Sequence, residues 1–142
     1  MHEADGYPSA WPQDPAHWLT PAKLVDARVA EVDGVVVGQV GIGASLLPQA
    51  VRDVVPGVAL LSVIRLFVAP SNRRGGVGGR LLDAAVELAG RRGCRAVLDV
   101  EVGGAAAISL YERAGWRRVH SGPAGWTMAD RRVASLHYYL GP

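Results

Sequence analysis

The sequence predicts an α/β domain in which helices flank a mixed, mostly antiparallel sheet. The chain has 142 residues, 49% hydrophobic and 20% charged, which is the size and balance of one globular domain over residues 1–142. Two apolar segments joined by Asp33-Gly34 predict an antiparallel hairpin. Farther along, segments with helical spacing alternate with strand-like segments, which places helices on the faces of the sheet.

The N-terminal segment, residues 1–22, is expected to be irregular because four of the 9 prolines fall there. One short helix fits, with Asp14 as its cap and Pro15 at its first position. Two strands follow, Leu24–Val32 and Val35–Ile42. The dipeptide between them favours the positive φ angles that a tight hairpin turn requires.

The middle of the chain predicts a loop, a buried strand and a long helix. Glycines and prolines punctuate residues 43–57, where we expect a loop with one helical turn. The strand Ala59–Val68 is apolar almost throughout, as expected when both faces are covered. From Val77 onward apolar residues recur on one side of a helix, which is expected to end at Gly90 and Gly93.

The C-terminal part predicts the order strand, helix, strand, strand. The helix is expected over Ala105–Arg113, introduced by Gly103-Gly104 and ended by Ala114-Gly115. A loop with Gly122, Pro123 and Gly125 is expected between the last two strands. The three strands are Cys94–Val102, Trp116–His120 and Ala134–Leu140.

Composition and charge exclude several classes of function. A net charge of +2 gives no electrostatic case for nucleic-acid binding. The longest apolar stretch, Val58–Ala69, is cut by Arg65 and is shorter than a membrane span of about 20 residues. The start lacks a signal peptide's basic and apolar regions, and Cys94 is the single cysteine, so we expect a cytoplasmic protein. The 4 histidines show no metal-ligand spacing, so no metal site is expected.

The segment most informative about function is the glycine-rich stretch between Val68 and Leu82, where a strand ends and an amphipathic helix begins. Glycines let backbone N–H groups approach an anion closely, and a helix start adds unpaired donors with partial positive charge. Arginines nearby add full charge. The stretch therefore predicts a phosphate-binding site formed by Arg73, Arg74, Gly75, Gly76, Val77, Gly78, Gly79 and Arg80.

Two common phosphate motifs do not fit this stretch. A P-loop needs a lysine after its second glycine, and the only lysine of the chain is Lys23. A dinucleotide fingerprint fails because Leu81 stands where the third glycine belongs. The pattern that remains, Arg73-x-x-Gly76-x-Gly78, resembles the acetyl-CoA pyrophosphate loop of the GNAT superfamily of N-acetyltransferases.

A second segment, residues 107–116, resembles the same family. Ala107 and Tyr111 stand four residues apart on a predicted helix that ends in Gly115 followed by Trp116, like the family's Ala-x-x-x-Tyr signature. The resemblance covers roughly residues 24–120. It implies a GNAT fold and an enzyme that transfers an acetyl group from acetyl-CoA to a primary amine of a small molecule or peptide.

The resemblance also implies where acetyl-CoA is held. Backbone N–H groups of residues 75–79 would hold the pyrophosphate, with Arg73, Arg74 or Arg80 near its oxygens. The main chain of the strand would bond the pantetheine and the acetyl carbonyl, and the start of the second signature would lie near the same ligand. The residues implied there are Leu66, Phe67, Val68, Gly104, Ala107 and Tyr111.

Two residues are candidates for acid and base. Tyr111 matches the family tyrosine beside the thioester sulfur, and a phenol with a pKa near ~10 can protonate the leaving thiolate. The acceptor amine must lose a proton before it attacks, and strand alternation puts Val97, Asp99 and Glu101 on one face. Glu101 is the candidate base; an ordinary solvated or ion-paired surface acid is the alternative that the sequence leaves open.

The chain departs from the family pattern at three places. Gly104 stands where an asparagine is common, and Ser62 stands where many relatives carry an acidic residue. About 22 residues precede Leu24, so the family's first strand is expected to be missing, and the exposed sheet edge favours a homodimer. These departures leave open a second function, a CoA-binding sensor or partner subunit without turnover. A weaker third is a nucleotide-phosphate binder that uses the same loop.

Overall fold

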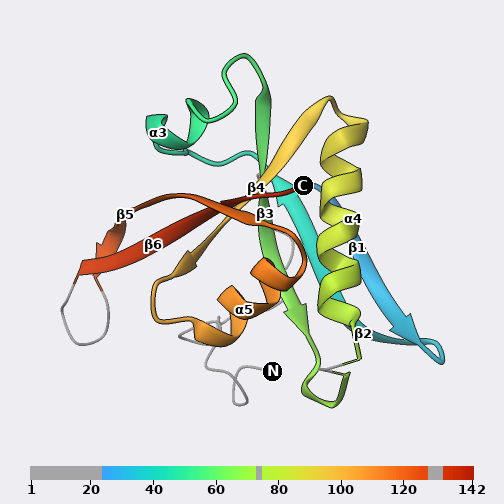
Figure 1. Cartoon of the computed structure of the whole chain (residues 1–142). Helices are drawn as coiled ribbons and strands as arrows, with labels where there is room; N and C mark the ends of the chain where they lie inside the picture. Colours follow the sequence, from blue (N-terminus) through green and yellow to red (C-terminus); the bar gives the residue numbers. More distant parts are fainter. Residues whose placement is uncertain (1–23, 73–74, 128–132) are drawn as a thin grey trace.

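The computed structural model describes residues 24–72, 75–127 and 133–142, which are built around a six-stranded sheet (Figure 1). The short helix expected at Asp14 lies outside the described residues. The elements are, in chain order, β1 (Leu24–Val32), β2 (Val35–Gly43), α3 (Gln49–Arg52), β3 (Ala59–Val68), a 3-10 turn (Pro70–Asn72), α4 (Val77–Arg91), β4 (Cys94–Glu101), α5 (Ala105–Arg113), β5 (Arg117–Thr127) and β6 (Val133–Leu140).

The sheet is mixed, with the strand order β1-β2-β3-β4-β6-β5. Only β3 and β4 pair in parallel among the described strands, because α4 carries the chain back across the sheet between them. All other neighbours are antiparallel. The predicted fold class and the predicted order of strands and helices are therefore confirmed.

The turn between β1 and β2 has the geometry that its sequence predicts. Asp33 has φ 51° and Gly34 has φ 79°, so both central residues lie in the left-handed region. Asp and Gly tolerate that region better than other residues, and such a turn matches the twist of the two strands that it joins.

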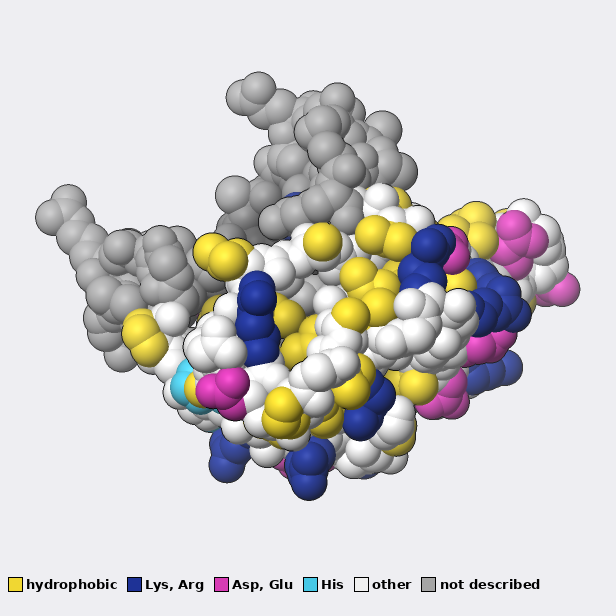
Figure 2. Space-filling view, turned by 90° about the horizontal axis from the view of Figure 1, so that it is seen from above, with side chains coloured by type: hydrophobic (Ala, Val, Ile, Leu, Met, Phe, Trp, Pro, Cys, Tyr) yellow, Lys and Arg dark blue, Asp and Glu magenta, His cyan; other side chains and the backbone are white. Residues whose placement is uncertain are grey.

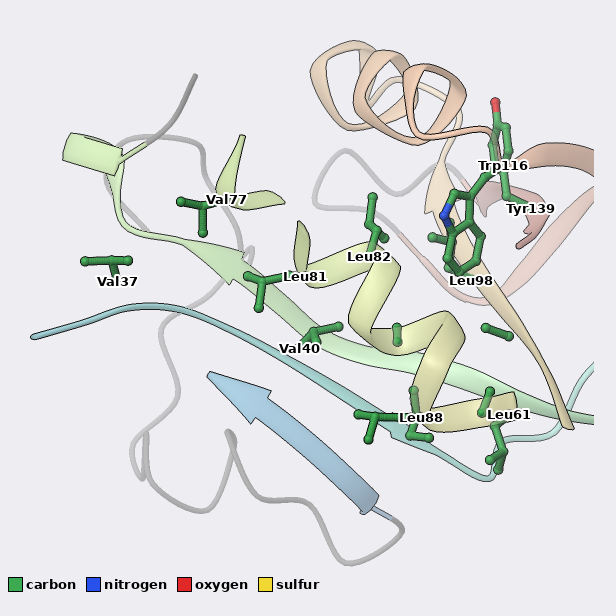
Figure 3. Close-up of a cluster of buried hydrophobic side chains, with 14 residues drawn as sticks. Val37, Val40, Leu61, Val77, Leu81, Leu82, Leu88, Leu98, Trp116 and Tyr139 are labelled. Atoms are coloured by element: carbon green, nitrogen blue, oxygen red, sulfur yellow. The ribbon is translucent and has the colours of Figure 1, made fainter. Parts of the chain in front are cut away.

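The main core lies between the sheet and α4, whose apolar stripe faces inward as its spacing predicts. Leu82 is 0% exposed and packs with strand residues such as Val40 and Leu98. Trp116 and Tyr139 lie side by side in the same cluster (Figure 3). Residues of α5 also pack against this cluster, so α4 and α5 cover one face of the sheet.

A smaller core lies on the opposite face of the sheet. Val97 is the strand residue at its centre, and its neighbours Ala96 and Leu98 point into the main core, as strand alternation requires. Val51 of α3 is 1% exposed and packs there with Leu136 and Tyr138. The connection between β2 and β3 therefore covers part of this face.

One local prediction is wrong, and a second, the end of the long helix, is correct for Gly93 but not for Gly90. The segment with Gly122, Pro123 and Gly125, expected to be a loop, lies within β5. Register shifts between Arg118/His120 and Pro123/Thr127 accommodate it, and β5 lies at the end of the described sheet, where proline is tolerated. The long helix also continues through Gly90, and it is Gly93, with φ 70°, that turns the chain toward β4.

Candidate functional site

The parallel strands β3 and β4 separate halfway along their length. They are paired from Ala59 and Cys94 to Ser62 and Val97, and the described pairing stops there. β3 nevertheless continues to Val68 and β4 to Glu101. The middle of the sheet therefore opens into a gap between two strands, below their last paired residues.

A bulge in β3 lies on the edge of this gap. Arg65 has φ 56°, a strained value for a residue other than glycine, and the pairing with β2 shifts register between Gln39 and Gly41. Strained residues of this kind gather at functional sites. Here the bulge changes the alternation of β3, because Leu61 and Val63 pack on the main core before it and Leu66 and Val68 after it.

The start of α4 lies at the end of β3, as the sequence predicts. Gly76 occupies the N-cap position with φ 80°, and no side chain caps the helix. Backbone N–H groups at the first positions of a helix have no partner within the helix and carry partial positive charge. The N–H groups at Val77, Gly78 and Gly79 have no acceptor within the helix and are therefore available to an anion.

Arg80 adds its charge at the same point. Its guanidinium donates to the carbonyl oxygens of Gly75 at 3.0 Å and Gly76 at 3.4 Å. The side chain is thereby folded back over the loop that precedes α4. Arg73 and Arg74, the other two predicted phosphate ligands, lie outside the described residues.

Two glycines of this helix start differ in what surrounds them. A β carbon at Gly78 would lie 3.1 Å from Leu110 Cδ2, so Gly78 lets α5 approach α4 closely. A β carbon at Gly79 would meet no atom within 4 Å. The space in front of Gly79 is therefore open to a ligand.

α5 carries Tyr111 on the same face of the sheet as α4. Tyr111 is half-buried against the main core, and its ring centroid is 6.0 Å from that of Tyr139 with the planes tilted by 57°. Gly104 is the N-cap residue of α5, and a β carbon there would lie 3.1 Å from Val100 Cγ2. An asparagine would crowd this position, so the departure at Gly104 has a local packing reason.

The carboxylates of β4 lie on the other face. Asp99 and Glu101 share the alternation of Val97, which packs in the smaller core, so they point away from α4 and α5. Asp99 is the cross-strand partner of Tyr138. Partial desolvation of the carboxyl raises the pKa of Asp99 above its ordinary value, although the residue as a whole is exposed.

Ser62 is the buried polar residue at the upper end of the gap. It is 8% exposed, and its hydroxyl is hydrogen bonded to that of Ser45. A serine pair therefore occupies the place where the resemblance led us to look for an acidic residue facing the acceptor.

Two shallow grooves lie on opposite faces of the sheet. A groove of about 550 Å³ opens beside Tyr138 on the Asp99 face and is lined by Leu46, Leu47, Pro48, Gln49, Arg52 and Tyr138. A groove of about 570 Å³ runs along α5 and is lined by Val102, Ala105, Ile108, Ser109, Glu112 and Arg113. Neither groove is lined by residues at the start of α4.

The structure brings most of the predicted residues to the gap and adds others. Leu66, Val68 and Tyr111 pack against the main core, Phe67 points to the other face, and the start of α4 follows directly. Asp99 shares the strand face of Glu101, and the strand pattern alone does not separate the two residues. The contact of Tyr139 with Glu112 forms only after folding and has no local signal in the sequence.

The described part of the chain has no candidate metal site and no helix that could span a membrane, and the face seen in Figure 2 has no basic patch. Figure 2 shows arginine side chains spread among hydrophobic and acidic ones on the face seen there, without one basic patch. No group of three or more His, Cys, Asp or Glu residues in 24–72, 75–127 and 133–142 could hold a metal ion. No helix over those same ranges is long and apolar enough to cross a membrane.

Comparison with known families gives one match. The model of the acetyltransferase (GNAT) family matches residues 2–116, which is more than half of the chain. Among curated protein sequences, none matches this chain.

Solved structures share the fold. The ribosomal-protein-S18-alanine N-acetyltransferase of Escherichia coli is 20% identical with a TM-score of 0.66, over 94% of this chain and 79% of that chain. The ribosomal-protein-alanine N-acetyltransferase of Brucella melitensis is 25% identical with a TM-score of 0.63, over 80% of this chain and 66% of that chain. Arabidopsis thaliana NAA60, solved in complex with acetyl-CoA, is 19% identical with a TM-score of 0.67, over 88% of this chain and 79% of that chain.

Proposed function

Because this chain belongs to the acetyltransferase (GNAT) family, we propose that it transfers an acetyl group from acetyl-CoA to a primary amine of a small molecule or peptide. The observation that carries the proposal is the gap between β3 and β4, which begins beyond Ser62 and Val97 and ends beside the uncapped start of α4. A ligand with a pyrophosphate at one end and a thioester at the other fits this arrangement.

The residues around the gap suit acetyl-CoA. N–H groups at Val77, Gly78 and Gly79 face the anion, and Arg80 adds charge, with Arg73 and Arg74 proposed beside them. The main chain at Leu66, Phe67 and Val68 runs along the gap toward them, and Gly104 and Ala107 lie at the start of α5 across from α4. When bound, acetyl-CoA supplies the activated acetyl group.

The candidate acid and the candidate bases lie on opposite faces of the sheet. Tyr111 lies on the face of α4 and α5, where the phosphate site also lies, so its phenol is on the side from which the thiolate would leave. Asp99 and Glu101 lie on the opposite face, where an amine could approach through the gap. Acid and base would thus act from opposite faces of the sheet, and holding amine and thioester together would supply much of the rate.

The base is proposed among the two carboxylates. Asp99 is two residues beyond the last β3–β4 pair, about 7 Å along the strand, and Glu101 is about 13 Å along it. Asp99 is favoured because it is nearer the closed end of the gap and its raised pKa makes its carboxylate a stronger proton acceptor. Glu101, the candidate from the sequence, is the second choice.

The proposed activity is tested with a panel of amines. The panel should include small amines, amino acid amides and a peptide with an N-terminal alanine, because two structural neighbours are named for alanine acetylation. We expect transfer to at least one acceptor. Binding of acetyl-CoA without transfer to any acceptor would support the second function, a sensor or partner subunit, and stronger stabilisation by ATP than by CoA would support the nucleotide binder.

Asp99→Asn is expected to remove the acidic limb of the pH profile of kcat/KM, while Glu101→Gln keeps it. The limb reports protonation of the base, which then cannot accept the amine proton. The raised pKa means that the folded state binds more protons than the unfolded state, so ionisation of Asp99 lowers the free energy of unfolding as pH rises. Asp99→Asn should therefore be no less stable at pH 7 in urea. If Glu101→Gln lost the acidic limb and Asp99→Asn kept it, the base would be Glu101.

A homodimer through the β1 edge is proposed as well. β1 ends the described sheet, and five valines of the hairpin are 40% to 62% exposed, namely Val25, Val29, Val32, Val35 and Val36. We expect light scattering at micromolar concentration to give twice the mass of the chain and Val29→Glu to give the monomer mass. A monomeric wild-type chain would contradict this proposal.

The cytoplasmic location and the single domain over 1–142 stay predictions of the sequence.

A further inference from the structure

We propose that Tyr139 and Glu112 are positioning residues that hold Tyr111 in place through α5. The inference deepens the proposed function, since it rests on the role proposed for Tyr111. It is carried by the hydrogen bond between the two side chains, by the contact between the two tyrosine rings, and by the burial of Tyr139 in the main core.

α5 is a short helix that depends on its contacts with the sheet and with α4. It has nine residues, none of them fully buried, and no side chain caps its start at Gly104. A short helix without caps depends on tertiary contacts for its stability. Its packing contacts come from half-buried residues such as Ile108, Leu110 and Tyr111. Any fixed point between α5 and the sheet therefore has a large influence on where Tyr111 lies.

Tyr139 is such a fixed point. Its side chain is 0% exposed in the main core, where it lies beside Trp116 (Figure 3). Its hydroxyl donates a hydrogen bond of 2.9 Å to Glu112 Oε2, which joins β6 to the residue next to Tyr111. Its ring contacts the Tyr111 ring at a centroid distance of 6.0 Å. One buried side chain thus touches Tyr111 directly and holds the following residue.

The surroundings of the pair keep Tyr139 in its donating form. Burial raises the pKa of Tyr139 and the hydrogen bond and charge of Glu112 raise it further, while Arg118 lowers it. Arg118 contacts His137 Nε2 at 3.4 Å, and Ser121 contacts His137 Nδ1 at 2.6 Å, so these polar groups are engaged with one another on the same face. The phenol therefore stays protonated at ordinary pH, and the anchor persists where the enzyme works.

The position of an acid matters because proton transfer needs donor and acceptor within hydrogen-bond reach, and a displacement of about 1 Å can lower a rate about 100-fold. Loss of the anchor should therefore lower kcat more than it weakens binding of acetyl-CoA. The phosphate site at the start of α4 does not depend on the Tyr139 hydroxyl.

The test uses Tyr139→Phe, which keeps the ring and removes the donor, and Glu112→Ala, which removes the acceptor and keeps a residue that favours the helix. We expect each to lower kcat about 10-fold with KM for acetyl-CoA within about threefold, and the pair together to lower it no further. Glu87→Ala is the control, because Glu87 is exposed and pairs with Arg91 on α4. It should leave kcat unchanged. If Tyr139→Phe fails to fold, Glu112→Ala still decides.

The Tyr111→Phe background separates positioning from general stability. With the Tyr111 hydroxyl removed, Tyr139→Phe has nothing left to position, so we expect no further loss of kcat. An equal loss in both backgrounds, or an unchanged kcat in Tyr139→Phe, would overturn the inference. If the wild-type chain transfers no acetyl group, the proposed function fails by itself. Hydrogen exchange then decides: faster exchange over 105–115 alone in Tyr139→Phe supports the anchor, and unchanged exchange overturns it.

Discussion

Gly79→Glu is expected to weaken binding of acetyl-CoA at least 10-fold while the protein stays folded. The substitution puts a negative charge at the helix start where the N–H groups of α4 face the proposed pyrophosphate, and a like charge opposes the ligand there. The fold should tolerate it because a β carbon at Gly79 meets no atom within 4 Å. A glutamate in the first turn also favours the helix. Isothermal titration calorimetry with acetyl-CoA measures the loss.

Gly90→Glu is the matched control for this prediction. Gly90 lies in the same helix near its other end, and a β carbon there also meets no atom within 4 Å. Both variants replace glycine within a helix, so both should have a thermal midpoint close to that of the wild type. Equal affinity for acetyl-CoA in the two variants would remove the start of α4 from the binding site, and the proposed function with it.

The elements predicted correctly are those whose signals are local. The backbone preferences of Asp33 and Gly34 are enough to predict the hairpin turn. The apolar residues of α4 recur with the period of a helix, which places them on one buried side. The glycine-rich turn between β3 and α4 also lies within a short stretch of sequence. For this reason the turn and the helix start that follows it could be predicted without a structure.

The features that the sequence could not supply depend on pairing between distant segments. Pro123 indicates a loop by its local preference, but its place at the end of the described sheet lets it remain in β5. The strain at Arg65 arises from the register against β2 and has no local signal. Likewise the raised pKa of Asp99 and the contact of Tyr139 with Glu112 come from neighbours far away in sequence.

Tyr111→Phe is expected to lower kcat about 100-fold, the lower end of the range for removal of a general acid, and to leave KM for acetyl-CoA within about threefold. The aromatic ring that packs on the main core beside Tyr139 is retained, so the loss should not come from unfolding. Without the phenol the thiolate must leave unprotonated, and the barrier rises in the step that expels it. Steady-state kinetics over a range of acetyl-CoA concentrations measures the two constants.

The leaving group gives the sharpest test of this assignment. An acetyl thioester of a more acidic thiol needs no proton to depart, so it should lose much less rate in Tyr111→Phe than acetyl-CoA does. Ser109→Ala removes a hydroxyl from the exposed side of the same helix and should leave both rates unchanged. If Tyr111→Phe slowed both thioesters by the same factor, Tyr111 would be a packing residue of α5, and the proton for the thiolate would have to come from water.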